Sequence, residues 1–238
     1  MDISELYTKC DRLWCVDSEG AREEAYSLLK SVSHQFEEDA DFLWRLAKAS
    51  FMYSKLFESD KKRRKEICTE AKRYAYKAAE LAPHNAYVHK WCALTLGSLK
   101  DFMSVNEKIL CGHKFKEHID KALELCHTDP VLYHLRARWC FSVASMNAVE
   151  RKAAKTLFTE PPRSTFQEAL EDFLRAEALK PNQWIQNMLY IGKSYIKLKD
   201  LSAAKTYLEQ LQHLSVTTIE DKVAFDEAMK IWTKKFKK

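Results

Sequence analysis

Apolar residues recur along most of this chain at the three- and four-residue intervals of an amphipathic helix. The pattern is clearest in three segments, AKRYAYKAAELAP (71–83), FKEHIDKALELCH (115–127) and ALEDFLRAEALKP (169–181). Each segment has apolar residues at its first, fifth and eighth positions and ends in Pro or His. This spacing places the apolar residues on one helical face. Each segment is therefore predicted to be the second helix of a repeated helix pair.

Each of these segments is followed by a new amphipathic stretch, at 87–99, 131–144 and 185–197, and another stretch at 42–57 precedes the first. The last stretch contains Gly192 and Tyr195, and Ala204, Leu208 and Leu211 follow it. These spacings match the tetratricopeptide pattern, in which a small residue lets two antiparallel helices approach closely. Four helix pairs are predicted.

The intervals between the repeats are irregular. The segment ends Pro83, His127 and Pro181 are 44 and 54 residues apart, against about 34 for a standard tetratricopeptide unit. We expect the extra residues between first and second helices, at 58–66, 100–114 and 147–162, with a helix at 149–158 before a break at Pro161-Pro162.

Further amphipathic stretches flank the repeats, at 3–14 and 21–36 before them and at 219–236 after them. The fold class predicted is all-α, a tetratricopeptide-like helical-repeat solenoid with extra N-terminal helices and a C-terminal capping helix. The predicted domains are an N-terminal helical pair at 1–38, the repeats at 39–216, and the capping helix with a basic tail at 217–238.

Composition supports this fold and narrows the function. Only 4 Gly and 5 Pro occur in 238 residues, which disfavours strand-rich folds and glycine-rich phosphate loops. No secretory signal or transmembrane stretch is recognisable. The seven cysteines form no Cys-x-x-Cys pair, so we expect reduced thiols and a cytoplasmic location.

The net charge of +5 is unevenly distributed. Residues 1–60 contain 7 Lys and Arg against 13 Asp and Glu, whereas residues 61–238 contain 32 against 21. A basic body suggests polyanionic partners. The acidic N-terminal segment suggests a hypothesis of its own, that it folds across the basic surface as an internal competitor.

Several stretches resemble the regulator of microtubule dynamics family of tetratricopeptide-like proteins. They are HKWCALTLG (89–97), EKILCGHKFKEHIDKALEL (107–125), LRARWCFSVA (135–144), EALEDFLRAEALKP (168–181) and LYIGKSYIKL (189–198). The resemblance extends over roughly 41–214. Two positions depart from the family pattern, His127 in place of a more usual Pro and Ala137 in place of a frequent Gly.

The resemblance implies a non-catalytic protein that binds tubulin or microtubules, regulates their dynamics and organises the spindle, with a cytoskeletal location at spindles and spindle poles. Some family members carry an N-terminal membrane anchor and act at organelle contacts. No such segment is recognisable here, so that role is not expected.

Repeat numbering predicts a basic concave groove. The positions that face it are Phe42 and Arg45, Tyr87 and Lys90, His134 and Arg138, and Leu189 and Lys193. A cation from every repeat, beside aromatic or aliphatic neighbours, suits an acidic extended segment such as a tubulin tail. Alternatives are a peptide-docking adaptor for acidic segments, a module for phospholipid headgroups, or cations that are merely solvated or paired with carboxylates.

A second basic surface is predicted at the run Lys61-Lys62-Arg63-Arg64-Lys65. It is interpreted as a contact for the negatively charged microtubule lattice, against the alternatives of a solvated helix start or a nuclear-import or nucleic-acid patch. The C-terminal Lys234-Lys235-Phe236-Lys237-Lys238 is interpreted as a solvated tail. No nucleic-acid partner is expected.

No catalytic or cofactor site is predicted. Cys111, His113, His118, Cys126 and His127 lie within 17 residues, but no pair has a metal-ligand spacing. Cys111 and His113 are too close in sequence to form a useful nucleophile–base pair. The aromatic residues Trp44, Trp91, Trp139, Phe173 and Tyr195 fall at helix-packing positions. We therefore predict neither an enzyme, nor a cofactor, nor a metal site.

Overall fold

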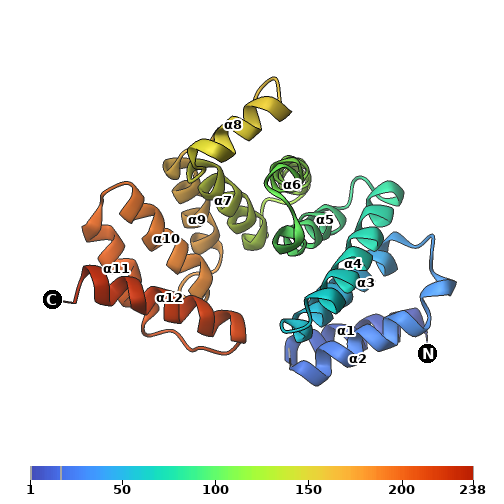
Figure 1. Cartoon of the computed structure of the whole chain (residues 1–238). Helices are drawn as coiled ribbons and strands as arrows, with labels where there is room; N and C mark the ends of the chain where they lie inside the picture. The colour runs from blue at the N-terminus through green and yellow to red at the C-terminus, as the bar shows by residue number, and fades with distance from the viewer. Residues whose placement is uncertain (1, 17, 238) are drawn as a thin grey trace. The chain divides into compact units, whose positions relative to one another are not determined.

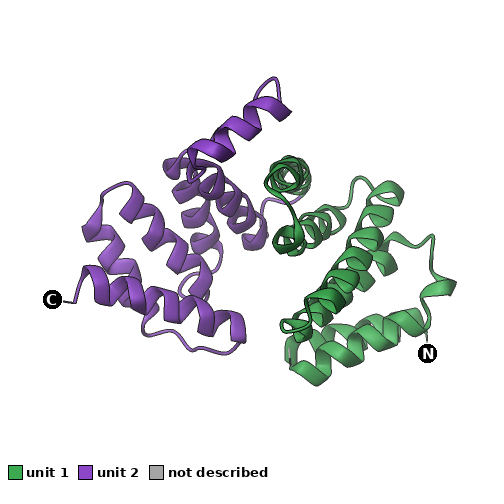
Figure 2. Ribbon diagram, in the orientation of Figure 1, with its two compact units in different colours: residues 1–125 green, residues 126–238 purple. Residues whose placement is uncertain are grey.

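A computed structural model describes residues 2–16 and 18–237 of the chain, and this part contains helices and no strand (Figure 1). The prediction of an all-α protein is confirmed. The chain divides into two compact units, unit 1 at Met1–Leu125 and unit 2 at Cys126–Lys238 (Figure 2). Met1, Asp17 and Lys238 lie outside the described residues.

Unit 1 consists of three antiparallel helix pairs. Its helices are α1 (Ile3–Val16), α2 (Glu19–Ser31), α3 (Ala40–Ser54), α4 (Lys61–Leu81), α5 (Ala86–Ser98) and α6 (Val105–Leu125), with short 3-10 turns at Ser33–Gln35, Lys55–Phe57 and Lys100–Phe102. The pairs are α1 with α2, α3 with α4, and α5 with α6, and each second helix except α6 also packs on the next first helix. The predicted N-terminal helices thus form a pair stacked on the repeats.

Unit 2 contains two further pairs and a closing helix. Its helices are α7 (Pro130–Ala144), α8 (Ala148–Leu157), α9 (Phe166–Leu179), α10 (Ile185–Lys197), α11 (Leu201–Leu211) and α12 (Ile219–Lys235). The pairs are α7 with α9 and α10 with α11, and α12 packs on α10 and α11. The four predicted pairs and the closing helix are confirmed. The three-part domain division at residues 38 and 216 stays a prediction.

Most helices begin where a short polar side chain accepts a hydrogen bond from the first turn. Asp39, Asp60, Asn85, Asp129 and Asp200 cap α3, α4, α5, α7 and α11 in this way. Asn147, Thr165 and Thr218 form reciprocal capping boxes at α8, α9 and α12. Each cap satisfies backbone N–H groups that lack an intrahelical partner. The helix boundaries therefore follow from local sequence.

The small residues of the repeat pattern lie where the helices pack. Ala71, Ala75 and Ala78 of α4 are fully buried, as are Ala169 and Ala176 of α9. Because a methyl group occupies little space, the backbones of neighbouring helices approach closely and larger side chains fill the adjacent volume. This is the role that the sequence pattern predicted for them.

The extra residues of the irregular repeats do not lie mainly in loops. In the first two repeats they lengthen the second helices, since α4 and α6 each have 21 residues and begin inside the expected insertions at 58–66 and 100–114. In the third repeat they form α8, close to the predicted 149–158. None of the described helices is both long enough and apolar enough to cross a lipid bilayer.

Candidate anion-binding surfaces

Two of the four predicted groove cations lie in unit 1, on the face presented by the first helices α1, α3 and α5, here called the first-helix face. Arg45 is on α3, and Lys90 is on α5 with its ammonium 4.7 Å from the ring centroid of Tyr87. Tyr87 is 55% exposed and stacks on Trp44 of α3 at 5.4 Å. Two cations and two aromatic rings thus share this face.

Arg45 is held between two aromatic rings. Its guanidinium carbon lies 4.0 Å from the ring centroid of Tyr7 on α1 and 4.2 Å from that of Trp44. Its Nη1 donates to the backbone oxygen of Asp41 at 2.9 Å, and the Asp41 carboxylate is 3.9 Å away. Stacking on ring faces favours a guanidinium electrostatically and limits its motion. Arg45 is therefore positioned before any partner arrives.

Lys48 is a third cation of this face, and the repeat pattern did not predict it. Its ammonium lies 3.7 Å from the ring centroid of Trp14 on α1 and 6.0 Å from that of Trp91 on α5. Lys48 is three residues after Arg45, which places both on one side of α3. That spacing could have revealed it, but Lys48 falls outside the positions that the repeat pattern assigns to the concave surface.

The other two groove cations lie in unit 2 and differ in their surroundings. Arg138 of α7 is exposed, with its guanidinium 4.1 Å from the ring centroid of Tyr190. Lys193 of α10 lies 4.4 Å from the same ring and forms an ion pair of 2.7 Å with Glu227 of α12. The closing helix thus neutralises Lys193. This agrees with the alternative that some groove cations are paired with carboxylates. A continuous groove through both units stays a prediction.

Three of the predicted groove residues pack inside their units. Phe42 and Leu189 are buried core side chains, and His134 is only 3% exposed. The His134 ring lies 4.2 Å from that of Trp184, and its Nδ1 is 3.0 Å from the side-chain oxygen of Asn187. Burial lowers the pKa of His134 to about 3, so the ring is neutral at physiological pH. His134 therefore supports the fold and supplies no positive charge to a partner.

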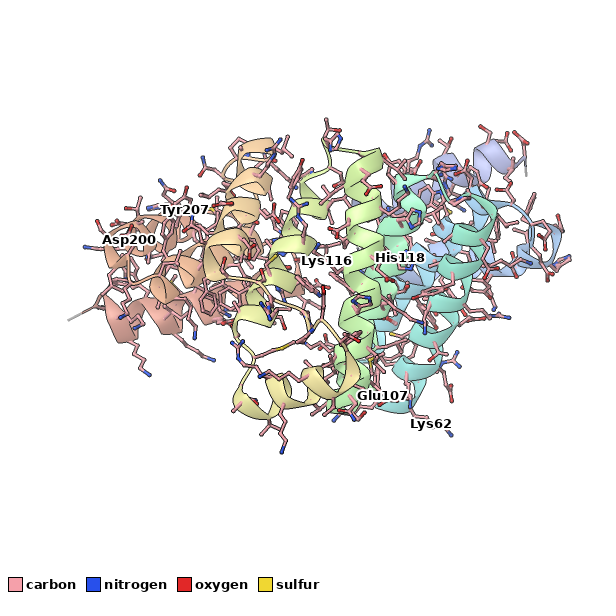
Figure 3. The ribbon with its side chains drawn as sticks, turned by 90° about the horizontal axis from the view of Figure 1, so that it is seen from above. Lys62, Glu107, Lys116, His118, Asp200 and Tyr207 are labelled. Carbon is pink, nitrogen blue, oxygen red and sulfur yellow. The ribbon has the colours of Figure 1, made fainter. Side chains whose placement is uncertain are left out.

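The outer basic run forms the start of α4. Lys61, Lys62 and Lys65 are exposed, and Lys62 projects from this end of the helix (Figure 3). Arg64 pairs with Asp101 at 3.3 Å and Arg63 with Glu66 at 3.8 Å. The positive end of a helix disfavours cations, so these lysines do not stabilise the start of α4. Three exposed ammonium groups at this end thus offer charge to an anionic partner.

An open hollow of about 580 Å³ adjoins this run. Tyr26 of α2 and Ile67 of α4 contribute to its wall, and Arg63, Lys65 and Arg73 line it together with Glu66 and Glu70. Glu70 is already engaged by Lys30 and by the hydroxyl of Tyr74. The hollow is thus of mixed charge, and the exposed lysines beside it carry the positive potential of this surface.

The Cys and His residues that invited a metal interpretation are dispersed. His118 of α6 (Figure 3) faces His89 of α5, with their Nδ1 atoms 3.0 Å apart, and burial lowers the pKa of His118 to about 4. Cys111 contacts the backbone oxygen of Leu96. Among the residues that the structure describes, no group of three His, Cys, Asp or Glu side chains is placed to hold a metal ion.

The C-terminal basic tail continues the last turn of α12. Lys234 and Lys235 end the helix and, with Lys237, are exposed, while Lys238 lies outside the described residues. Cations at a helix C-terminus interact favourably with the helix dipole. This local stabilisation accounts for the described lysines without a ligand.

Consecutive helix pairs within each unit define the class, a tetratricopeptide-like helical-repeat protein. A thermophilic tetratricopeptide protein of Thermus thermophilus has this fold, with a TM-score of 0.63 at 12% identity, covering 94% of this chain and 98% of that one. The MamA protein matches with a TM-score of 0.51 at 12% identity, covering 93% and 94%. At these identities the likeness concerns the fold alone.

The chain belongs to the family described as Regulator of microtubule dynamics protein 1-3, which it matches over residues 6–237. It is 36% identical to regulator of microtubule dynamics protein 2 of Rattus norvegicus, over 97% of this chain and 55% of that protein. It is also 36% identical to protein 1 of Bos taurus, over 97% of this chain and 71% of that protein. The chain thus spans about half the length of the rat relative.

Proposed function

We propose that this chain binds microtubules without catalysing a reaction, and that it regulates microtubule dynamics and spindle organisation as a cytoskeletal scaffold. The observation that carries the proposal is the pairing of two basic surfaces in unit 1 with membership of a family named for microtubule dynamics. The surfaces are the first-helix face with Arg45, Lys48 and Lys90, and the outer basic run at 61–65.

The partner's chemistry follows from these side chains. Ammonium and guanidinium groups pair with carboxylates, and aromatic neighbours reduce the local dielectric, which strengthens such pairs. Tubulin's acidic tails and acidic lattice supply carboxylates in quantity. Binding through exposed charges must weaken with salt, because such charges are screened over about 8 Å at physiological ionic strength.

The test is co-sedimentation with stabilised microtubules at low and near-physiological salt, with and without the tubulin tails. We expect pelleting that falls as salt rises and falls again when the tails are removed. A chain that stays in the supernatant at low salt would exclude direct lattice binding.

Two variants distinguish the contributions of the two surfaces to microtubule binding. Replacing Lys61, Lys62 and Lys65 by Gln removes three exposed charges from the outer run, and replacing Arg45 and Lys90 by Gln alters the first-helix face. The matched control replaces Lys180, Lys199 and Lys205 by Gln, three exposed lysines of unit 2. If microtubule binding is lost in the first two variants and kept in the control, position rather than net charge decides binding.

A peptide-docking adaptor is the second candidate, and the cation–aromatic contacts of the first-helix face favour it. An adaptor would bind an acidic peptide through a groove cation, Lys90 in unit 1 or Arg138 in unit 2, and would not need the outer run. Charge reversal at these two residues, with loss of peptide binding and no effect of the outer-run variant, would place the adaptor first. A phospholipid headgroup offers the same anionic chemistry, and vesicle co-flotation would distinguish it.

A further inference from the structure

Arg45 and Lys48, with the rings of Tyr7, Trp14, Trp44 and Trp91, form what is here called the cation–aromatic site. The two cations stand on α3, while Tyr7 and Trp14 come from α1 and Trp91 comes from α5. All three helices belong to unit 1. The site is therefore assembled within one compact unit, and a helix that precedes the predicted repeats supplies two of its rings.

Hydrogen-bond donors outnumber acceptors at this site. Within residues 2–16 and 18–237, four buried side-chain nitrogen or oxygen atoms have no hydrogen-bond partner, and three of these are Tyr7 Oη, Trp14 Nε1 and Arg45 Nε. A buried donor without an acceptor costs free energy. The site thus holds three polar atoms whose hydrogen-bonding capacity its own side chains leave unused.

The electrostatics of Lys48 point the same way. Burial lowers its pKa to about 8, Lys90 and Arg45 act in the same direction, and Asp11 of α1 opposes them. The charged form of Lys48 is thus disfavoured where it stands. A ligand carboxylate beside Lys48 would stabilise the charged form, and this favours the binding of an acidic ligand.

The spacing of the two cations suggests which acidic sequence fits. Side chains three residues apart on a helix have Cβ atoms about 5–6 Å apart. In an extended chain, alternate side chains point to the same side at intervals of about 6.6 Å. Two carboxylates at alternate positions therefore match the two cations, whereas two adjacent carboxylates point to opposite sides.

We propose that the cation–aromatic site recognises an acidic extended segment through two carboxylates at alternate positions, with Lys48 as a binding residue and α1 as an integral wall of the site. The inference rests on the proposed function, because the partner class is the same. It differs from the hypothesis that the acidic N-terminal segment competes for the basic surface, because it makes α1 part of the binding site through its aromatic rings. Damage to α1 therefore weakens binding.

The test uses the full chain and two blocked peptides of equal composition. One peptide carries four glutamates at alternate positions among glycines, and the other carries them as two adjacent pairs separated by four glycines. Titration by tryptophan fluorescence and calorimetry compares their affinities. We expect the alternating peptide to bind several-fold more tightly.

Lys48→Gln should lower the affinity for the alternating peptide about tenfold, which is the effect of losing one charge-assisted hydrogen bond. It should also remove the preference for the alternating peptide over the paired one. Trp14→Leu, which keeps an apolar side chain, should also weaken binding. Lys180→Gln is the control, because Lys180 is an exposed lysine of unit 2. Circular dichroism and thermal melting of each variant establish that it is folded.

Equal affinity for the two peptides, or native affinity in folded Lys48→Gln, would overturn the inference. The proposed function is judged separately. Co-sedimentation that needs the outer run and is unaffected by Lys48→Gln would leave the microtubule proposal standing and this inference wrong. Peptide binding that depends on Lys48 and Trp14, without co-sedimentation, would support the site and contradict the microtubule proposal.

Discussion

Gly192 of α10 and Leu208 of α11 are so close that a Cβ atom added at residue 192 would lie 2.8 Å from Leu208 Cγ and 2.9 Å from Leu208 Cδ2. Both residues are buried, and Leu208 has no exposed surface. The glycine is thus required by the close approach of two helices rather than by its backbone conformation, which is helical.

The Gly192→Ala substitution should therefore destabilise the protein by about 1–3 kcal/mol, because the added methyl group overpacks the α10–α11 contact. Urea unfolding measures this. Gly97→Ala is the matched control, since a Cβ there meets only Phe115 at 3.8 Å. Alanine favours a helix over glycine, so the control should gain about 0.5–1 kcal/mol. Equal stability of the two variants would contradict the packing explanation.

The stability of the α7–α9 helix pair should depend on the ion pair between Arg136 and Asp172. The Nε and Nη2 atoms of Arg136 donate to the two Asp172 oxygens at 2.6 Å each, and Asp172 is 9% exposed. Asp172→Ala removes these two charge-assisted hydrogen bonds from an arginine side chain that is 30% exposed, and should cost about 2–3 kcal/mol in urea unfolding. Asp226→Ala breaks the exposed pair with Lys222 and should cost less than about 0.5 kcal/mol.

Stability should fall as pH drops below about 6.5, the pKa of His134 in the unfolded chain. Burial lowers the folded-state pKa to about 3, so folding favours the neutral ring. The stability contributed by this difference is present above pH 6.5 and is lost as pH falls toward 3, by up to about 1.4 kcal/mol per pH unit. Urea unfolding at pH 7.5, 6 and 5 measures the slope.

Two histidine variants test whether His134 accounts for this pH dependence of stability. His134→Gln cannot be protonated and should show a shallower pH dependence than the native chain. His213→Gln removes an exposed histidine and should keep the native slope. An unchanged slope in His134→Gln would mean that other groups account for the acid sensitivity.

Glu227→Gln should strengthen anion binding by unit 2, if the proposed function is correct. The Glu227 carboxylate is 2.7 Å from the Lys193 ammonium and neutralises it. Releasing that charge should raise microtubule co-sedimentation about two- to fivefold at low salt, the scale of one partly exposed ion pair. Weaker co-sedimentation in Glu227→Gln would show that unit 2 does not contact the partner through Lys193.

The helix pairs were predictable because their signals are local. Apolar residues such as Ala71, Ala75 and Ala78 repeat at the helical period, and caps such as Asp60 and Thr165 stand within a few residues of the helix start they stabilise. The family resemblance extended that prediction to function, and the comparisons confirm the family.

The candidate site was only partly predictable. Arg45 and Lys90 both stack on aromatic rings of the first-helix face, but Lys48 was missed, and His134 proved to be buried. Whether a lysine is free, stacked on an aromatic ring or paired with a carboxylate depends on side chains far along the chain. Trp14 lies 34 residues before Lys48, and Glu227 lies 34 residues after Lys193.

By itself, the sequence determined the class of fold, the four repeats, the closing helix and the family, because period, caps and motifs are properties of neighbouring residues. Tertiary structure alone decided which cations are neutralised, which histidines are buried, and that α1 places aromatic rings beside the cations of α3. The physical reason is that charge and burial are set by distances between helices, and those distances arise only when the helices pack.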